Sequence, residues 1–223
     1  MEIEPQETPE IDSLPVFPLP TAVLFPGIVI PLHVDEPGYC KLIADALEKD
    51  GGVAVAMIKP NEDGDTPPLC DIAGAGQIIE AQKLDGGEYD VLIQGLDRVR
   101  LLEELPQNGD YRRFKAEIIP KPDDDETDAA RDELVRLESC VTNLMASVAE
   151  SDAQLVEVMR ATPDPVQLAD FLSATVVQDI EVQQDLLETV NLKSRLTKLL
   201  DVLVDVLGHA ATPTSTSKPA QLN

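Results

Sequence analysis

The segment LPVFPLPTAVLFPGIVIPLHV, residues Leu14 to Val34, intersperses apolar residues with five prolines. Proline cannot donate a backbone hydrogen bond to a β-ladder, so prolines in strands are found at strand starts, edges and bulges. The segment therefore predicts two short, bent strands on either side of a turn at Phe25-Pro26-Gly27, rather than one flat central strand. A β-rich fold is expected to begin here.

The residues that follow predict one helix and further strands. Apolar residues from Tyr39 to Leu47 recur at helical spacing, and Gly51 lies where a helix C-terminus favours glycine. The Asp85-Gly86-Gly87 sequence separates two strand-like segments and predicts a hairpin, because its turn requires positive φ angles. Strands are predicted at residues 52–58, 76–84, 88–94, 98–105 and 111–119. We expect an antiparallel meander that curls into a small barrel-like module with one helix packed on it.

The chain changes character near Pro120. Eleven of the twelve glycines and six of the seven aromatic residues precede it, whereas residues 123–207 contain no glycine and two prolines. Apolar residues then repeat at spacings of three and four, which predicts helices at about 128–149, around 155–159, from Pro165 after an Asp164 cap, and from an Asn191 cap to about 207. Helices with short joints predict a bundle.

The predicted fold class is therefore α+β, with a β-rich amino-terminal subdomain that carries one helix and a carboxy-terminal helical bundle. The predicted boundaries are a disordered acidic tail at 1–12, the β-rich subdomain at 13–120, the bundle at 121–208 and a disordered tail at 209–223. The tails have the Glu/Pro and Ser/Thr/Pro composition of segments that cannot bury a core.

The charge of the chain restricts its partners. Seventeen Lys and Arg against forty-two Asp and Glu give a formal net charge of −25, which repels nucleic-acid phosphates and anionic lipids. The amino terminus has no basic residue before an apolar run, and no apolar stretch approaches the ~20 residues that span a bilayer. We expect a cytoplasmic protein that binds neither nucleic acid nor membrane.

No motif in the chain predicts catalysis, a cofactor or a metal. The glycines of IAGAGQ, Ile72 to Gln77, lack a following GK[ST] and lead into a strand, so they do not predict a phosphate site. Cys40, Cys70 and Cys140 form no CxxC pair, which indicates buried reduced thiols rather than a zinc site or disulfides. Catalytic, cofactor-binding and metal-binding residues are all expected to be absent.

Several segments together resemble one known family. They are the proline-rich segment extended to Tyr39, the hairpin GGEYDVLIQGLDRVRLLEE at Gly86 to Glu104, YRRFKAEI at Tyr111 to Ile118, and the helical segments DPVQLADFLSA at Asp164 to Ala174 and QQDLLETVNLKSRLTKLLDVL at Gln183 to Leu203. In this order and at these separations, residues 13–208 resemble the amino-terminal domain of Lon ATP-dependent proteases.

The resemblance implies a PUA-like β-rich subdomain followed by a helical bundle, and a role in binding polypeptides. The P-loop ATPase and Ser-Lys protease domains of full-length Lon have no counterpart here, so the resemblance implies a stand-alone Lon-domain protein that is not an enzyme. We expect a non-catalytic module that binds polypeptide segments or a partner protein and can act as an adaptor for unfolded or misfolded proteins, with weak homo-oligomer formation as an option. The alternative is a hydrolase or peptidase with an unrecognised active site.

Two groups of residues are candidates for the binding surface. The first is the predicted turn with its neighbours, which comprises Leu24, Phe25, Pro26, Gly27 and Tyr39. The second is a set of basic residues that stand out in an acidic chain, namely Arg98, Arg100, Arg112 and Arg113. For Leu24 and Tyr39 the alternative is a place in the core, and for the arginines it is pairing with Glu103, Glu104 and Glu117.

Overall fold

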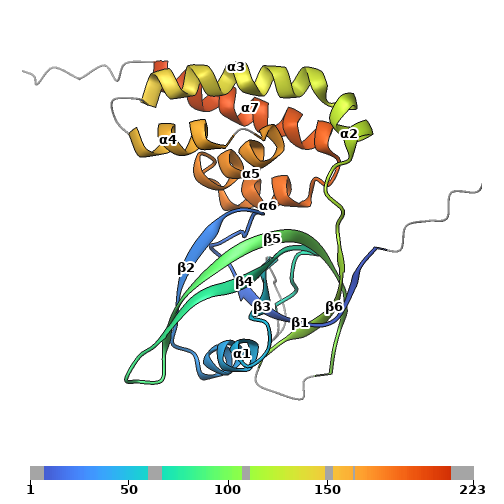
Figure 1. Cartoon of the computed structure of the whole chain (residues 1–223), viewed down its shortest axis with the longest axis vertical. Helices are drawn as coiled ribbons and strands as arrows, with labels where there is room; N and C mark the ends of the chain where they lie inside the picture. The colour runs from blue at the N-terminus through green and yellow to red at the C-terminus, as the bar shows by residue number, and fades with distance from the viewer. Residues whose placement is uncertain (1–7, 60–66, 107–110, 149–152, 163, 212–223) are drawn as a thin grey trace, which may run out of the picture.

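A computed structural model describes residues 8–59, 67–106, 111–148, 153–162 and 164–211. Its amino-terminal half is a twisted β-sheet with one helix, and its carboxy-terminal half is a stack of helices at one end of the sheet (Figure 1). This confirms the α+β class and the order of the two halves.

The sheet has six strands and one covering helix. They are β1 (Glu10–Leu19), β2 (Val29–Val34), α1 (Pro37–Leu47), β3 (Gly52–Met57), β4 (Ile72–Lys83), β5 (Tyr89–Glu104) and β6 (Arg113–Ile118). The strand order is β2-β5-β4-β3-β1-β6, and β5 also pairs with β6. The pairings therefore form a closed cycle through β5, β4, β3, β1 and β6. β2 lies outside this cycle and pairs with the first half of β5.

The topology differs from the predicted meander in three ways. β1 pairs in parallel with β3, so the sheet is not purely antiparallel. β5 is one sixteen-residue strand with register shifts against β4, whereas the sequence predicted separate strands on either side of Gly95. β1 begins at Glu10, where it pairs with Glu117 of β6, so the predicted disordered tail at 1–12 is too long. Residues 1–7 lie outside the described residues.

Two apolar clusters belong to the amino-terminal half alone. One is formed by residues of the cycle of strands and includes four alanines, Ala54, Ala56, Ala73 and Ala116, beside larger apolar side chains. The other packs α1, through Leu42 and Ile43, against larger residues of the sheet and β2. The alternation of small and large residues along the strands thus separates a narrow interior from an outer face that a helix covers.

The second half contains α2 (Asp124–Ala129), α3 (Arg131–Val148), α4 (Ala153–Ala161), α5 (Pro165–Thr175), α6 (Ile180–Glu188) and α7 (Leu192–Ala211). Asp164 accepts backbone hydrogen bonds at the start of α5, and Asn191 accepts one from Ser194 at the start of α7, so both predicted caps are confirmed. The short helix α2 begins at Asp124, before the predicted start of the first helix at about 128. α7 extends to Ala211, beyond its predicted end at about 207 and that of the bundle at 208, and residues 212–223 lie outside the described residues.

A crossing segment, Val23-Leu24-Phe25, runs over β4 and β5. A Cβ added at Gly74 would overlap the carbonyl oxygen of Leu24, and one added at Gly95 would overlap that of Phe25. Glycine is therefore required where this backbone crosses the strands. The glycines that could have suggested a phosphate loop instead allow the close approach of two backbones.

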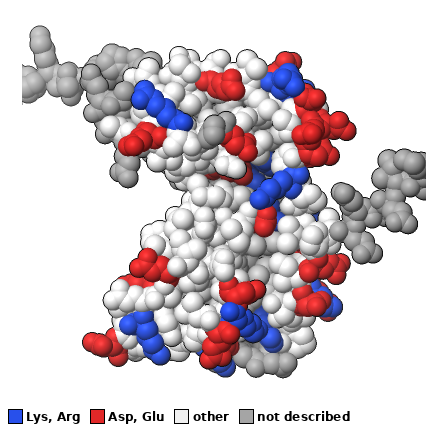
Figure 2. All heavy atoms as spheres, viewed as in Figure 1, with Lys and Arg blue, Asp and Glu red and all other residues white. Residues whose placement is uncertain are grey.

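The two halves share an apolar interface. Phe25, Ile72 and Ile119 from the first half belong to the same buried cluster as the leucines of α5, α6 and α7. Gln184 of α6 donates a hydrogen bond of 2.9 Å to the carbonyl oxygen of Ile72. The interface is thus apolar at its centre and also joined by polar contacts, and the surface narrows to a waist beside it (Figure 2).

Candidate functional site

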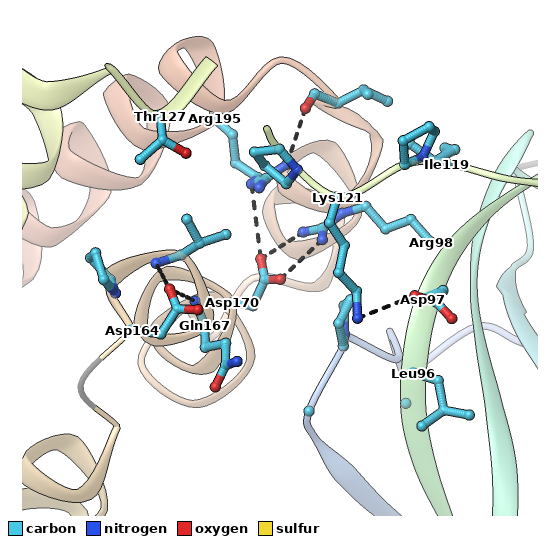
Figure 3. A pocket seen from close by; sticks show the side chains of 18 of the residues that line it. Leu96, Asp97, Arg98, Ile119, Lys121, Thr127, Asp164, Gln167, Asp170 and Arg195 are labelled. Carbon is cyan, nitrogen blue, oxygen red and sulfur yellow. Dashed lines mark hydrogen bonds and ion pairs between the residues drawn. The ribbon is translucent and has the colours of Figure 1, made fainter. Parts of the chain in front are cut away.

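A cavity of about 600 Å³ lies between the two halves (Figure 3). Its walls include four prolines, Pro26, Pro120, Pro122 and Pro165, and the side chain of Leu96, which is 43% exposed. Prolines restrict the backbone and offer apolar ring surface without a donor. The walls therefore combine rigid apolar surface with polar and charged side chains, as in many binding sites for organic ligands.

A buried ion pair forms part of the cavity floor. Arg98 reaches from β5 to Asp170 on α5, with Nη1 at 3.0 Å from Oδ2 and Nη2 at 2.6 Å from Oδ1. Arg98 Nε also donates to the carbonyl oxygen of Leu187 at 3.2 Å, and its guanidinium lies 5.9 Å from the centre of the Phe25 ring. The bidentate pair between Arg98 on β5 and Asp170 on α5 therefore fixes the position of the helical half relative to β5.

A second buried arginine lies beside the same carboxylate. Arg195, the fourth residue of α7, is 2% exposed, and its Nε is 3.8 Å from Asp170 Oδ1. Its Nη1 donates to the carbonyl oxygens of Thr189 and Val190 at 3.1 and 3.2 Å. Nε and Nη2 have no hydrogen-bond partner among the described residues. Burial and then the charge of Arg98 lower the pKa of Arg195 to about 10, against the opposing effect of Asp170, so it stays protonated at neutral pH.

The rim of the cavity is also charged. Lys121 Nζ lies 3.5 Å from Asp97 Oδ1, as Figure 3 shows, and Lys121 is largely exposed. Asp164, the cap of α5, accepts a 2.8 Å hydrogen bond from the backbone of Val166. Charges at the rim are solvated, so their pairing contributes little to stability. Charges at the floor are buried, so leaving them unpaired is costly.

Three of the predicted surface residues, Pro26, Gly27 and Arg98, line this cavity. The side chains of Leu24 and Phe25 do not reach the surface. Both are 0% exposed, so they occupy the core, which was the alternative for Leu24. Phe25 lies beneath the cavity, and the turn after it supplies part of the wall.

The other predicted residues lie elsewhere. Tyr39 packs on Phe17, with ring centres 5.2 Å apart, and is half-buried. Arg112 pairs with both carboxylate oxygens of Glu104 at 2.8 and 2.6 Å, and Arg100 Nε lies 4.0 Å from Glu117 Oε2. Arg113 is the first residue of β6 and is partly buried. These positions do not form one surface with the cavity.

The sequence reasoning missed Asp170 and Arg195. Both are on the buried stripe of their helix, Asp170 beside Leu168 and Leu172, and Arg195 between Leu192 and Leu199. A charged residue at an apolar position of a helical repeat is the signal that could have identified them, because isolated buried charges are costly.

No group of three or more His, Cys, Asp or Glu within the described ranges could hold a metal ion. The three cysteines are free thiols, and burial raises the pKa of Cys70 to about 11, so its thiolate is scarce at neutral pH. Over the same ranges, no helix is both long and apolar enough to cross a bilayer.

Comparisons with known proteins confirm the resemblance seen in the sequence. The family model of the ATP-dependent protease La (LON) substrate-binding domain matches residues 13–205. The Lon protease of Anaeromyxobacter dehalogenans is 32% identical over 195 residues, covering 85% of this chain and 23% of the relative. Lon protease 2 of Myxococcus xanthus is 30% identical over 208 residues, covering 90% and 24%. The chain thus spans about a quarter of the length of these relatives.

Two solved structures share the fold. The N-terminal domain of a Mycobacterium avium complex Lon protease has a TM-score of 0.65 at 20% identity, covering 88% of this chain and 98% of its own. The Lon N-terminal domain protein from Xanthomonas campestris has a TM-score of 0.62 at 21% identity, covering 86% and 98%. Both likenesses extend across the sheet and the helices.

Proposed function

Since the chain belongs to the family of the ATP-dependent protease La (LON) substrate-binding domain, we propose that it recognises polypeptide segments through the cavity between its two halves. The observation that carries this proposal is the cavity itself, with about 600 Å³ of space and preformed proline-rich walls. Apolar walls favour segments that expose aliphatic or aromatic side chains, at ~25 cal/mol for each Å² removed from water. Unfolded or misfolded proteins expose such segments.

We extend the proposal to the partners and location of the module. The module acts as a non-catalytic adaptor in the cytoplasm, binds no nucleic acid, and associates with itself weakly at most. The closed cycle of strand pairings supports the barrel-like, PUA-like description of the first half. The net charge of −25 supports the exclusion of nucleic acid, and the apolar walls support capture of polypeptides over an electrostatic partner.

The test compares two leucines of β5. Leu96 lies in the cavity wall and is 43% exposed, while Leu102 lies on the same strand outside the cavity and is 49% exposed. Fluorescence anisotropy of a labelled, permanently unfolded polypeptide measures binding by the wild type, Leu96→Ala and Leu102→Ala. We expect Leu96→Ala to weaken binding about tenfold or more, since burying a leucine side chain contributes roughly 1.5–3 kcal/mol, and Leu102→Ala to leave it unchanged.

Binding should also persist as salt is raised. The Debye length falls from about 8 Å at physiological ionic strength to about 3 Å at 1 M, which screens surface charges but leaves apolar contacts intact. Equal effects of the two alanine variants, or loss of binding at high salt, would contradict recognition through the cavity walls. Casein turnover by the purified chain would contradict the non-catalytic part of the proposal.

A further inference from the structure

We propose, building on the function proposed above, that the cavity also recognises a carboxylate group of the bound polypeptide, and that Arg195 is its partner. The walls of the cavity select apolar segments without regard to charge. The floor carries a charge that the apolar walls do not explain.

The charges of the buried floor do not balance. Two guanidiniums, Arg98 and Arg195, share the single carboxylate of Asp170, and all three side chains are at least nine-tenths buried. Arg98 takes both oxygens of that carboxylate, which leaves Arg195 Nε at 3.8 Å. Glu126 acts on Arg195 only as a more distant charge. A buried positive charge without a hydrogen-bonded counter-ion is unfavourable, so a site with this surplus favours an anion.

The free atoms of Arg195 have the geometry that a carboxylate requires. Nη1 is engaged by the carbonyl oxygens of Thr189 and Val190, while Nε and Nη2 make no hydrogen bond within the described part of the chain. Nε–H and an N–H of Nη2 lie along one edge of the guanidinium and match two carboxylate oxygens. Surrounding atoms cover both nitrogens here, so binding requires the guanidinium to turn towards the cavity.

The backbone near the floor favours the same sign of charge. Val190 lines the cavity just before the first turn of α7, and Pro165, at the first turn of α5, lines it too. The amino-terminal end of a helix carries a partial positive charge, which attracts anions and is unfavourable for a cation such as Arg195. The start of α5 already holds the Asp164 carboxylate, so an entering carboxylate would be stabilised by the start of α7 and by the arginine.

A polypeptide can supply this carboxylate from its chain terminus or from an Asp or Glu side chain. The experiment therefore uses four labelled apolar peptides of one sequence. The first has a free carboxyl terminus and no acidic residue, and the second is its carboxyl-terminal amide. The third and fourth are amides that carry one internal Glu or one internal Gln. Anisotropy titrations measure their affinities for the wild type, Arg195→Met and Arg100→Met.

We expect at least one carboxylate-bearing peptide to bind the wild type roughly tenfold more tightly than its neutral counterpart, as for a charge-assisted hydrogen-bonded pair. Which pair shows the difference identifies the source. Arg195→Met should abolish this difference. Arg100→Met should keep it, because Arg100 is half-exposed outside the cavity. The difference should persist at 1 M salt, since buried pairs are screened much less than surface pairs.

Equal affinity of all four peptides for the wild type would overturn the carboxylate proposal, and this comparison needs no variant. If Leu96→Ala still weakened binding in that case, the proposed function would stand alone. Failure of every peptide to bind would overturn both proposals. Arg195→Met should melt at or above the wild-type temperature, because it removes a buried charge with two unpaired donors. A Glu or terminal advantage that survived in a folded Arg195→Met would also contradict the role of Arg195.

Discussion

The two halves of the molecule differ in what completes their cores. The sheet and α1 contain two buried apolar clusters of their own. The pairing of β5 with β6 closes the sheet into a cycle of strands. The helices share their one cluster with residues of the first half, among them Phe25, Ile72 and Ile119. The helical half therefore depends on the sheet for part of its core, whereas the sheet depends on the helices much less.

The largest expected effect comes from separating the halves. A fragment ending at Pro120 should remain soluble and fold, but melt at a lower temperature than the parent, because it exposes the residues that face the helices. Residues 121–211 alone should show no cooperative transition, since no partner then covers the leucines of α5 to α7. Thermal melts followed by circular dichroism measure both. A first-half fragment that melts at the parent temperature would show that the helices are an independent domain.

Removing the polar joint between the halves should have the next largest effect. Asp170→Ala leaves Arg98 and Arg195 buried without their shared carboxylate, which should lower the free energy of unfolding by about 3–5 kcal/mol. The matched control is Asp185→Ala on α6, whose carboxylate pairs with Lys198 at 2.6 Å but is largely exposed. Its loss should cost about 1 kcal/mol or less.

Urea unfolding of the two variants beside the wild type measures the difference. Similar destabilisation by Asp170→Ala and Asp185→Ala would mean that the floor of the cavity is solvated and that the joint between the halves is apolar alone.

The smallest effect concerns the thiol at the interface. Cys70 belongs to the cluster shared by the two halves, and burial raises the pKa of its thiol from 9.0 to about 11. In a variant that retains only Cys70, labelling at pH 8 should therefore be roughly a hundredfold slower in the folded protein than in urea, because the reactive thiolate is scarcer. Labelling at equal rates would show that the halves separate readily.

The same shift gives a pH dependence with a defined sign. Between pH 9 and about 11 the folded state holds the Cys70 proton more tightly than the unfolded state. The free energy of unfolding should therefore fall as the pH rises through that window. The fall should be smaller in a Cys70→Ala variant than in the wild type, because the variant lacks the titrating thiol.

Local patterns in the sequence predicted the helices better than the sheet. The Asp164 and Asn191 caps and the spacing of leucines are short-range signals, and they placed α5 and α7 correctly. The parallel pairing of β1 with β3, and the start of β1 at Glu10, depend on partners that lie far away in the chain. Alternation within one strand does not reveal which strand will lie beside it.

The candidate site was predicted in part for the same reason. Arg98 and the Pro26-Gly27 turn were predicted as surface residues and do line the cavity. Phe25 was predicted on the same surface, but its side chain is buried. Asp170 and Arg195 acquire their role only when α5 and α7 meet β5. Their unusual position on buried helix faces was visible in the sequence, whereas the cavity that joins them required the fold.

The crossing segment bears on the order in which the molecule folds. Val23 and Phe25 enter the cluster shared with the helices, whereas Leu24 enters the cluster beneath α1, so three consecutive residues couple two cores. The helical partners of Phe25 come much later in the chain, and contacts between distant residues form slowly because long loops must close. We therefore expect docking of the helices onto this segment to be a late step in folding, so that changes in Phe25 accelerate unfolding more than they slow folding.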